Sequence, residues 1–210
     1  NYLIMDKNND CASVDLYESL NFCQGQTVLP GIRMEVFFQK KSNILGWPTL
    51  PGIASAGADM KKIATYDGDF VLAADKKWLQ LDVLTAASNI TSASQGEKPS
   101  KTFLNSATLK YADVDEAVTG FCRMANSDDL VFVVRQRNGK FRVLGSEAFE
   151  TNVNPSQDSG MAVTDASGTQ LEVSTTDVCP APYYTGRLLT EKGTIDCATG
   201  KLVVDEGAGG

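Results

Sequence analysis

Two apolar runs joined by Asn138-Gly139 form the strongest folding signal in the sequence. Residues 130–145 read LVFVVRQRNGKFRVLG, with valines, leucines and phenylalanines on both sides of this pair. Asn-Gly between two such runs predicts a β-hairpin, because a two-residue type I′ turn needs a positive φ at both central positions. The chain should therefore contain an antiparallel sheet, and the rest of the sequence has to supply its other strands.

The predicted hairpin carries four cations close to its turn. A two-residue turn places Arg137 opposite Lys140 and Arg135 opposite Arg142, so that all four side chains share one face. Like charges directly opposite each other destabilise a sheet, and the chain as a whole has a net charge of −7. We expect acidic side chains of an adjacent subunit to neutralise this face, which makes the four residues candidate inter-subunit contacts. A solvated face and a direct contact with DNA are the alternatives.

Short β-like runs bounded by turn residues recur along most of the chain. The expected strands, in chain order, are residues 32–39, 70–74, 78–85, 103–112 and 185–190, followed by shorter strands to residue 204. Two pairs of runs are expected to form hairpins of their own. The first joins residues 70–74 to residues 78–85, and the second lies within residues 161–177, around Ala166-Ser167-Gly168.

Residues 86–102 are predicted to form a long extended loop. They are rich in Ser, Thr, Gly and Lys and contain one proline. A structureless segment of this length is uncommon inside a compact domain and is usually functional or disordered. We expect it to leave its own domain and to contact a neighbouring subunit.

One helix is predicted over residues 113–126. Asp113 is the expected N-cap, and Glu116 follows three residues later, as in a capping box. Apolar side chains recur at helical spacing and form one continuous stripe. The stripe consists of Val114, Ala117, Val118, Phe121, Cys122 and Ala125. We expect Val118 and Phe121 to anchor the helix on a sheet and Cys122 to be a core residue.

These elements predict a mainly β fold. We expect a two-sheet β-sandwich or barrel-like domain with one flanking α-helix and long loops, because one helix stands among many short strands. Residues 1–30 are assigned to an N-terminal arm, in which SVDLYESL could form a short helix, residues 31–204 to a single domain, and residues 205–210 to a flexible tail. The sequence leaves open whether residues precede Asn1, although an initiator methionine is not normally removed before asparagine.

Composition argues against catalysis. The chain has no histidine, which excludes a serine–histidine or cysteine–histidine nucleophile within it. It has no glycine-rich phosphate loop, and its carboxylate pairs lie where helix starts, turns and the tail account for them. Five widely spaced cysteines form neither a disulfide framework nor a zinc motif. We therefore expect no enzymatic activity, no cofactor and no metal. No apolar run reaches the length of a membrane span, so we expect no membrane partner.

The order of the segments resembles that of structural proteins from tailed bacteriophages of gut Bacteroidetes, specifically the tail tube class. The resemblance rests on FVLAADKKWLQLDVL, QGEKPSKTFLN, NGKFRVLGSEAFET, SGMAVTDASGTQLEV and CPAPYYTGRLL, and it covers about residues 30–200. It implies a two-sheet β domain with one flanking helix. It also implies stacked homo-oligomeric rings, usually hexameric, that form a hollow tube through which DNA passes without specific binding.

The resemblance places the protein in the virion, in contact with other tail proteins, after assembly in the cytoplasm of the bacterial host. It supplies no catalytic residues. Two other classes stay open. One is another phage ring protein, such as a head–tail connector or a tail terminator. The other is a β-sandwich that binds carbohydrate or a host surface, with Trp47 and the pair Tyr183-Tyr184 as candidate contacts.

Overall fold

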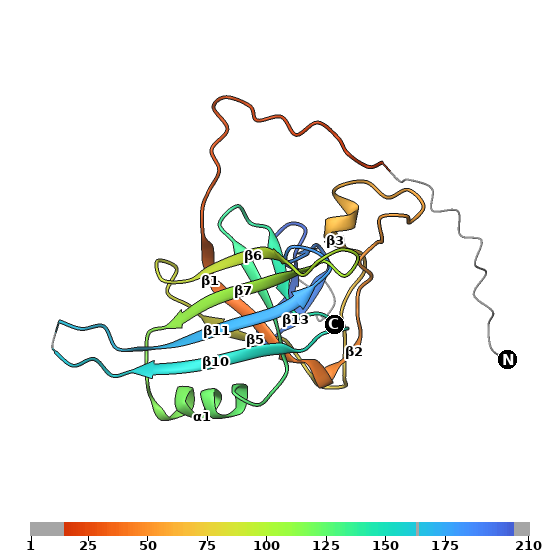
Figure 1. Cartoon of the computed structure of the whole chain (residues 1–210). Coiled ribbons are helices and arrows are strands. Elements are labelled where there is room, and N and C mark those ends of the chain that lie inside the picture. Colours follow the sequence, from red (N-terminus) through yellow and green to blue (C-terminus); the bar gives the residue numbers. More distant parts are fainter. Residues whose placement is uncertain (1–14, 163, 204–210) are drawn as a thin grey trace.

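The computed structural model describes residues 15–162 and 164–203, and it confirms the expected fold class (Figure 1). The protein is mainly β, with one α-helix and several sheets. Two antiparallel sheets provide most of the structure, and the helix α1 packs beside one of them. No helix within the described residues is long and apolar enough to cross a membrane.

The larger sheet has six strands in the order β3-β12-β9-β8-β1-β5. These strands are β3 (Thr65–Tyr66), β12 (Tyr183–Tyr184), β9 (Phe141–Leu144), β8 (Leu130–Gln136), β1 (Ile32–Lys40) and β5 (Leu79–Asp82). The β1 strand expected from the sequence is confirmed, and so is the β8–β9 hairpin. All pairs in this sheet are antiparallel except β12 with β3.

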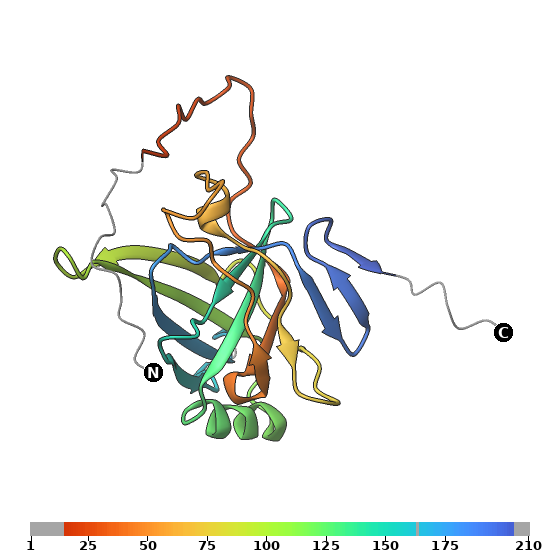
Figure 2. The same ribbon diagram turned by 90° about the vertical axis from the view of Figure 1, so that its right-hand side faces the viewer.

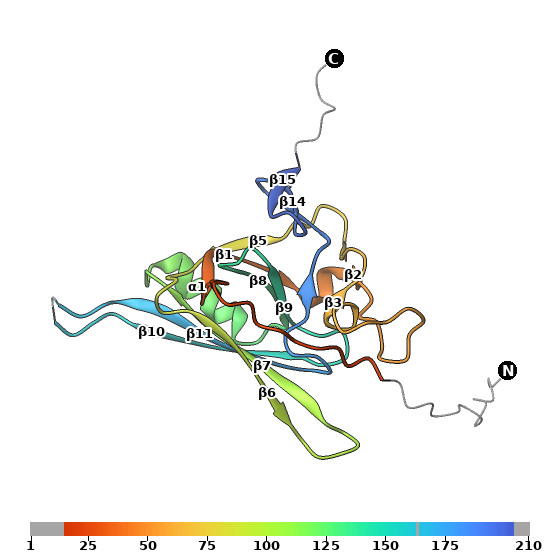
Figure 3. The same cartoon turned by 90° about the horizontal axis from the view of Figure 1, so that it is seen from above.

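The second sheet has four antiparallel strands in the order β10-β11-β7-β6. They are β10 (Thr151–Asp158), β11 (Gly168–Asp177), β7 (Thr102–Tyr111) and β6 (Asn89–Gln95). The strand predicted over residues 103–112 is therefore confirmed as β7. Both hairpins of this sheet, β6–β7 and β10–β11, extend well beyond the body of the domain (Figure 3).

Smaller elements complete the chain (Figure 2). They are the sheet of β13 (Arg187–Thr190), β14 (Gly193–Asp196) and β15 (Lys201–Val203), the pair β2 (Ile44–Gly46) and β4 (Val71–Leu72), and the short 3-10 helices η1 (Lys41–Asn43) and η2 (Lys62–Ala64). The strand expected near residues 185–190 and the shorter strands after it are confirmed.

The core has two halves, one on each face of the six-stranded sheet. On one face, Phe132 and Val134 of β8 pack with Leu109 of β7 and Leu171 of β11, which joins the two sheets. On the other face, Val131 and Val133 pack against a separate aromatic group. That group contains Phe37, Tyr66, Phe70, Trp78, Phe141 and Tyr184. Alternate side chains of a strand point to opposite faces, so the buried part of β8, Leu130–Val134, is apolar at every position.

The helix α1 (Glu116–Ala125) packs on the first half of the core, as expected. Cys122 is buried, and burial raises the pKa of its thiol. The predicted N-cap was wrong by two residues, because Asp115 rather than Asp113 caps the helix. The carboxylate of Asp115 accepts a hydrogen bond from the backbone N–H of Val118 at 2.8 Å.

Three expected strand arrangements were wrong. Residues 70–74 and 78–85 form no hairpin with each other, since β4 pairs with β2 and β5 pairs with β1. Residues 161–177 form no internal hairpin either, because β11 pairs along its length with β10 and β7. Residues 86–102 contain a regular strand, β6, rather than a structureless loop.

The predicted N-terminal arm lies partly outside the described residues. Residues 15–30 form neither helix nor strand, so the described part of the predicted short helix SVDLYESL is not helical. The expected flexible tail at residues 205–210 lies outside the described residues.

Phe121 should stabilise the contact between α1 and the core. Its ring meets the ring of Phe38 edge-on, with 5.3 Å between centroids. We expect Phe121→Ala to lower the free energy of unfolding by about 3 kcal/mol, since large-to-small core changes leave a cavity. Met124→Ala is the control on the same helix, because Met124 is 62% exposed. Urea titration measures both, and a loss below about 1 kcal/mol for Phe121→Ala would contradict this packing.

Candidate assembly surface

The turn of the β8–β9 hairpin differs from the predicted one by one residue. Arg135 pairs with Phe141 and Val134 pairs with Arg142, so three residues rather than two connect the strands. Gly139 has a φ of +90°, and its N–H bonds to the carbonyl of Gln136 at 2.9 Å. This is the three-residue hairpin loop in which a glycine bulge follows a type I turn. A shift of one residue moves side chains to opposite faces. The prediction that four cations share one face was therefore wrong.

The side chain of Arg135 makes its contacts within its own chain. Its guanidinium lies 5.2 Å from the centre of the Phe141 ring and donates to the carbonyl of Gly200 at 3.0 Å. One of its nitrogens lies 3.7 Å from a carboxylate oxygen of Glu35. Burial lowers the pKa of Arg135, and the nearby Arg33 lowers it further. These contacts occupy the guanidinium of Arg135 within its own chain and connect β8 to β1 and to the small C-terminal sheet.

Arg142 also serves the fold, on the opposite face. Its guanidinium donates to the carbonyls of Ala181 and, at 2.7 Å, of Pro180, and it lies 4.6 Å from the centre of the Tyr183 ring. Ala181 has a φ of +28°, which is unfavourable for a residue with a Cβ. Arg142 therefore holds a strained loop, together with the buried side chain of Asn105.

Arg137 and Lys140 remain exposed at the tip of the hairpin. The backbone N–H of Arg137 bonds to the carbonyl of Gly31 at 3.1 Å, and its own carbonyl accepts from Arg33 at 3.3 Å. The ammonium of Lys140 lies 5.4 Å from the centre of the Tyr183 ring. Within residues 15–162 and 164–203, neither Arg137 nor Lys140 forms an ion pair. Of the four candidate contacts, these two can meet an acidic partner.

Arg142 is bonded within the fold and Arg137 is exposed, so replacing each with alanine should change the free energy of unfolding by different amounts. We expect Arg142→Ala to lower the free energy of unfolding by about 2 kcal/mol, because it leaves the carbonyl of the buried Ala181 without its guanidinium donor. Arg137→Ala should change it by less than about 0.5 kcal/mol, since its side chain is exposed. Thermal or urea unfolding of the two variants measures this difference. Equal stability of the two variants would show that Arg142 is not structural.

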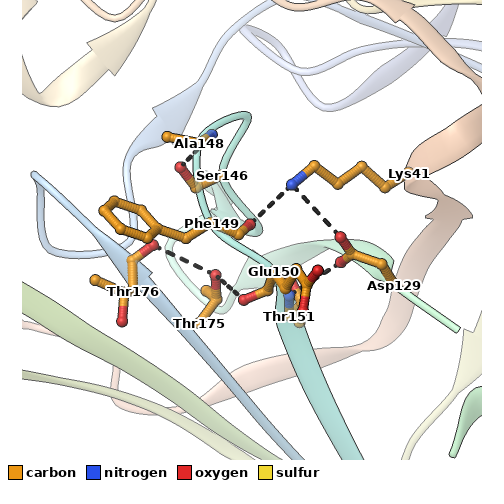
Figure 4. Close-up of polar contacts among 9 residues, drawn as sticks. All are labelled: Lys41, Asp129, Ser146, Ala148, Phe149, Glu150, Thr151, Thr175 and Thr176. Atoms are coloured by element: carbon orange, nitrogen blue, oxygen red, sulfur yellow. Dashed lines mark hydrogen bonds and ion pairs between the residues drawn. The ribbon is translucent and has the colours of Figure 1, made fainter. Parts of the chain in front are cut away.

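Acidic residues at the start of β8 neutralise other lysines. Asp128 lies 2.6 Å from Lys40, and Asp129 lies 3.4 Å from Lys41. Figure 4 shows how Asp129 joins the two sheets: its other oxygen accepts from the backbone N–H of Thr151 at 2.9 Å, while Lys41 donates to the carbonyl of Phe149 at 2.8 Å. This network fixes the entry into β10. It leaves the tip of the hairpin without an acid.

The outer edge of β6 is open. In an antiparallel edge strand about half of the backbone N–H and C=O groups point away from the sheet. None of the outward groups of Asn89–Gln95 has a hydrogen-bond partner in the part of the chain that the structure describes. The strand reads NITSASQ and contains neither a charge nor a proline, the usual protections of an edge.

The other edges of the two main sheets are protected. β10 contains Pro155, which lacks an N–H, and α1 packs beside it. β5 is flanked by the small C-terminal sheet, because the N–H of Trp78 bonds to the carbonyl of Leu189 at 2.8 Å. β3 is only two residues long. Among the edges of the two main sheets, the β6 edge is therefore the one best suited to pair with another chain.

A cavity with a volume of about 580 Å³ opens beside the hairpin tip. We call it the tip cavity. Lys61 and Lys140 line it together with Tyr183 and with the apolar side chains of Met60 and Phe141. Its lining comes from four separate segments, residues 60–65, 138–141, 183–185 and 197–199, and includes no carboxylate. A cavity with an apolar surface and lysines suits a ligand that is both apolar and anionic.

A second, smaller cavity lies at the end of β11 beside Asp177. Asp177 is 4% exposed, and one of its oxygens accepts from the N–H of Val178 at 2.6 Å. The other oxygen is buried without a partner. Burial raises the pKa of Asp177 to about 6, although the N–H groups of Val178 and Cys179 oppose the shift. An ionised Asp177 is thus unfavourable in the fold.

This raised pKa predicts a pH dependence of stability. Between the unfolded pKa near 4 and the folded pKa near 6, the folded state binds the proton more tightly, so stability falls as pH rises through this window. We expect the free energy of unfolding of the wild type, minus that of Asp177→Asn, to fall by about 2 kcal/mol from pH 4 to pH 7. Urea titration at a series of pH values measures this difference. A difference independent of pH would show that Asp177 ionises normally.

Sequence reasoning missed the β6 edge and the tip cavity. Comparisons of the chain with protein-family models, with curated proteins and with solved structures found no match. No group of three or more Cys, Asp or Glu residues within the described ranges is placed to hold a metal ion.

Proposed function

We propose that this protein is a virion structural protein that forms stacked rings of a phage tail tube. The observation that carries the proposal is the open edge of β6 on a hairpin that extends from the domain (Figure 3). Edge strands of this kind pair with a strand of another chain unless they are blocked. Pairing at this edge builds a ring when the neighbour presents a different surface to β6, because head-to-tail contacts close into a ring if the rotation between subunits completes a circle.

The resemblance of the sequence to tail tube proteins supports the same proposal. In it, rings of the protein, usually six subunits each, stack with other tail proteins in the virion. DNA passes through the lumen without specific binding, and the net charge of −7 is compatible with a bore that repels DNA. Arg135 and Arg142 have no part in the subunit contacts, whereas Arg137 and Lys140 do.

The β6 edge can be tested without disturbing the core. Ala93 is exposed in the middle of β6, opposite Leu104 of β7. Ala93→Lys places a charge on the edge, as natural edge strands do to prevent pairing. We expect it to weaken assembly by at least roughly tenfold in concentration while the monomer melting temperature stays the same. Ser100→Lys adds the same charge in the loop of the same hairpin and is the matched control.

Negative-stain electron microscopy and sedimentation velocity measure the outcome. The proposal predicts rings or tubes for the wild type and for Ser100→Lys, and smaller species for Ala93→Lys. Deleting residues 88–98 would be a poorer test, because it removes β6 from the sheet and exposes β7. A wild-type protein that stays monomeric at high concentration would favour a binding module, and closed single rings would favour a connector or terminator.

A further inference from the structure

The described part of the N-terminal arm exposes large apolar side chains. Tyr17 is 94% exposed, Leu20 is 87% exposed and Phe22 is 70% exposed. Exposed apolar surface is unfavourable by about 25 cal/mol per Å² relative to burial. A run of such residues in an extended segment marks a surface that another surface covers. The single chain leaves this segment without a covering surface.

The same segment is acidic. Asp15 and Glu18 flank Tyr17, and the sequence has no lysine or arginine from residue 8 to residue 32. Aromatic and aliphatic side chains thus alternate with carboxylates over Asp15–Phe22. A binding site for this segment would combine an apolar surface with cations.

The tip cavity has this complementary character. Lys61 and Lys140 are exposed beside the apolar side chains of Met60 and Phe141, and no carboxylate lines the cavity. Neither lysine forms an ion pair with any residue that the structure describes. Their charges are therefore available to an acidic ligand.

The arm also begins and ends next to this cavity. The carbonyl of Gly31 accepts from Arg137 at the hairpin tip, and the N–H of Glu18 lies 3.4 Å from the sulfur of Met60. Between these points the arm arches away from the domain (Figure 1). The described part of the arm therefore emerges from the domain beside this cavity.

We propose that the tip cavity binds the acidic and aromatic segment Asp15–Phe22 of a second copy of this chain. The inference rests on the proposed assembly and names the contact that connects its subunits in addition to the β6 edge. A second copy is the occupant because the chain's own segment leaves Tyr17 and Phe22 exposed while it lies beside the cavity. Each subunit would then fill one neighbour's cavity and have its own filled by another, in a head-to-tail series.

Zero-length carbodiimide cross-linking of the full-length protein tests this contact, because the reagent joins a carboxylate only to an amine that touches it. Light and ¹⁵N-labelled proteins are mixed under assembly conditions, cross-linked and analysed by mass spectrometry. We expect Asp15 or Glu18 joined to Lys61 or Lys140, in peptide pairs that combine a light half and a heavy half. Pairs of only one isotope would show that the arm binds its own chain and would overturn the proposal.

Charge reversal provides the matched control. Lys61→Glu with Lys140→Glu should abolish these cross-links, and adding Asp15→Lys with Glu18→Lys should restore them, since the reagent joins the reversed pairs equally well. Lys76→Glu with Lys77→Glu reverses two exposed lysines outside the tip cavity and should leave the cross-links unchanged. If rings form while the cross-links are absent, this inference fails and the proposed function stands. If the wild type forms neither, both fail.

Discussion

The burial of β8 on both of its faces is the constraint on which the rest of the structure depends. All five residues of Leu130–Val134 are buried, so water must be excluded from both sides of this strand. One sheet cannot do this alone. The four-stranded sheet and α1 cover one face, and an aromatic layer around Phe70, Trp78 and Tyr184 covers the other. The long segment between β1 and β5 contributes Phe70 and Trp78 to this aromatic layer, and so helps to exclude water from the second face of β8.

Charged side chains near the core form contacts that stabilise the fold. Arg135 and Arg142 hold backbone carbonyls on opposite faces of the hairpin, and Asp129 fixes the start of β10. Lys61 and Lys140 line the tip cavity without an ion pair to any described residue, and the outward backbone groups of β6 have no partner within the described structure.

The sequence predicted the elements whose pattern reflects burial. β1, β7, β8 and α1 each carry apolar residues at the spacing of a strand or a helix, and each was found near its expected bounds. β6 could not be recognised, because an edge strand on a projecting hairpin has polar side chains on both faces and shows no alternation. The same absence of alternation explains why residues 86–102 resembled a loop.

The register of the hairpin, and with it the candidate site, depended on one turn residue. Asn138 could adopt a positive φ, but its side chain instead accepts a hydrogen bond from the N–H of Lys140 at 3.0 Å, and Gly139 alone supplies the positive φ. The register that results from this turn places Arg135 and Arg142 on opposite faces of the hairpin. The tip cavity was beyond prediction for another reason: its lining comes from four separate segments, and the pairings of β12 with β9 and with β3 bring three of them together.

Hydrogen–deuterium exchange at low and high protein concentration tests most directly whether a second copy covers these surfaces. Amides of β6 that point outward exchange rapidly in a single chain, because they have no partner in the described structure. The account predicts that residues 89–95 and the arm residues 15–22 become protected as particles form, while the buried amides of β8 stay protected throughout. Particles that form while the exchange of residues 89–95 stays unchanged would contradict it.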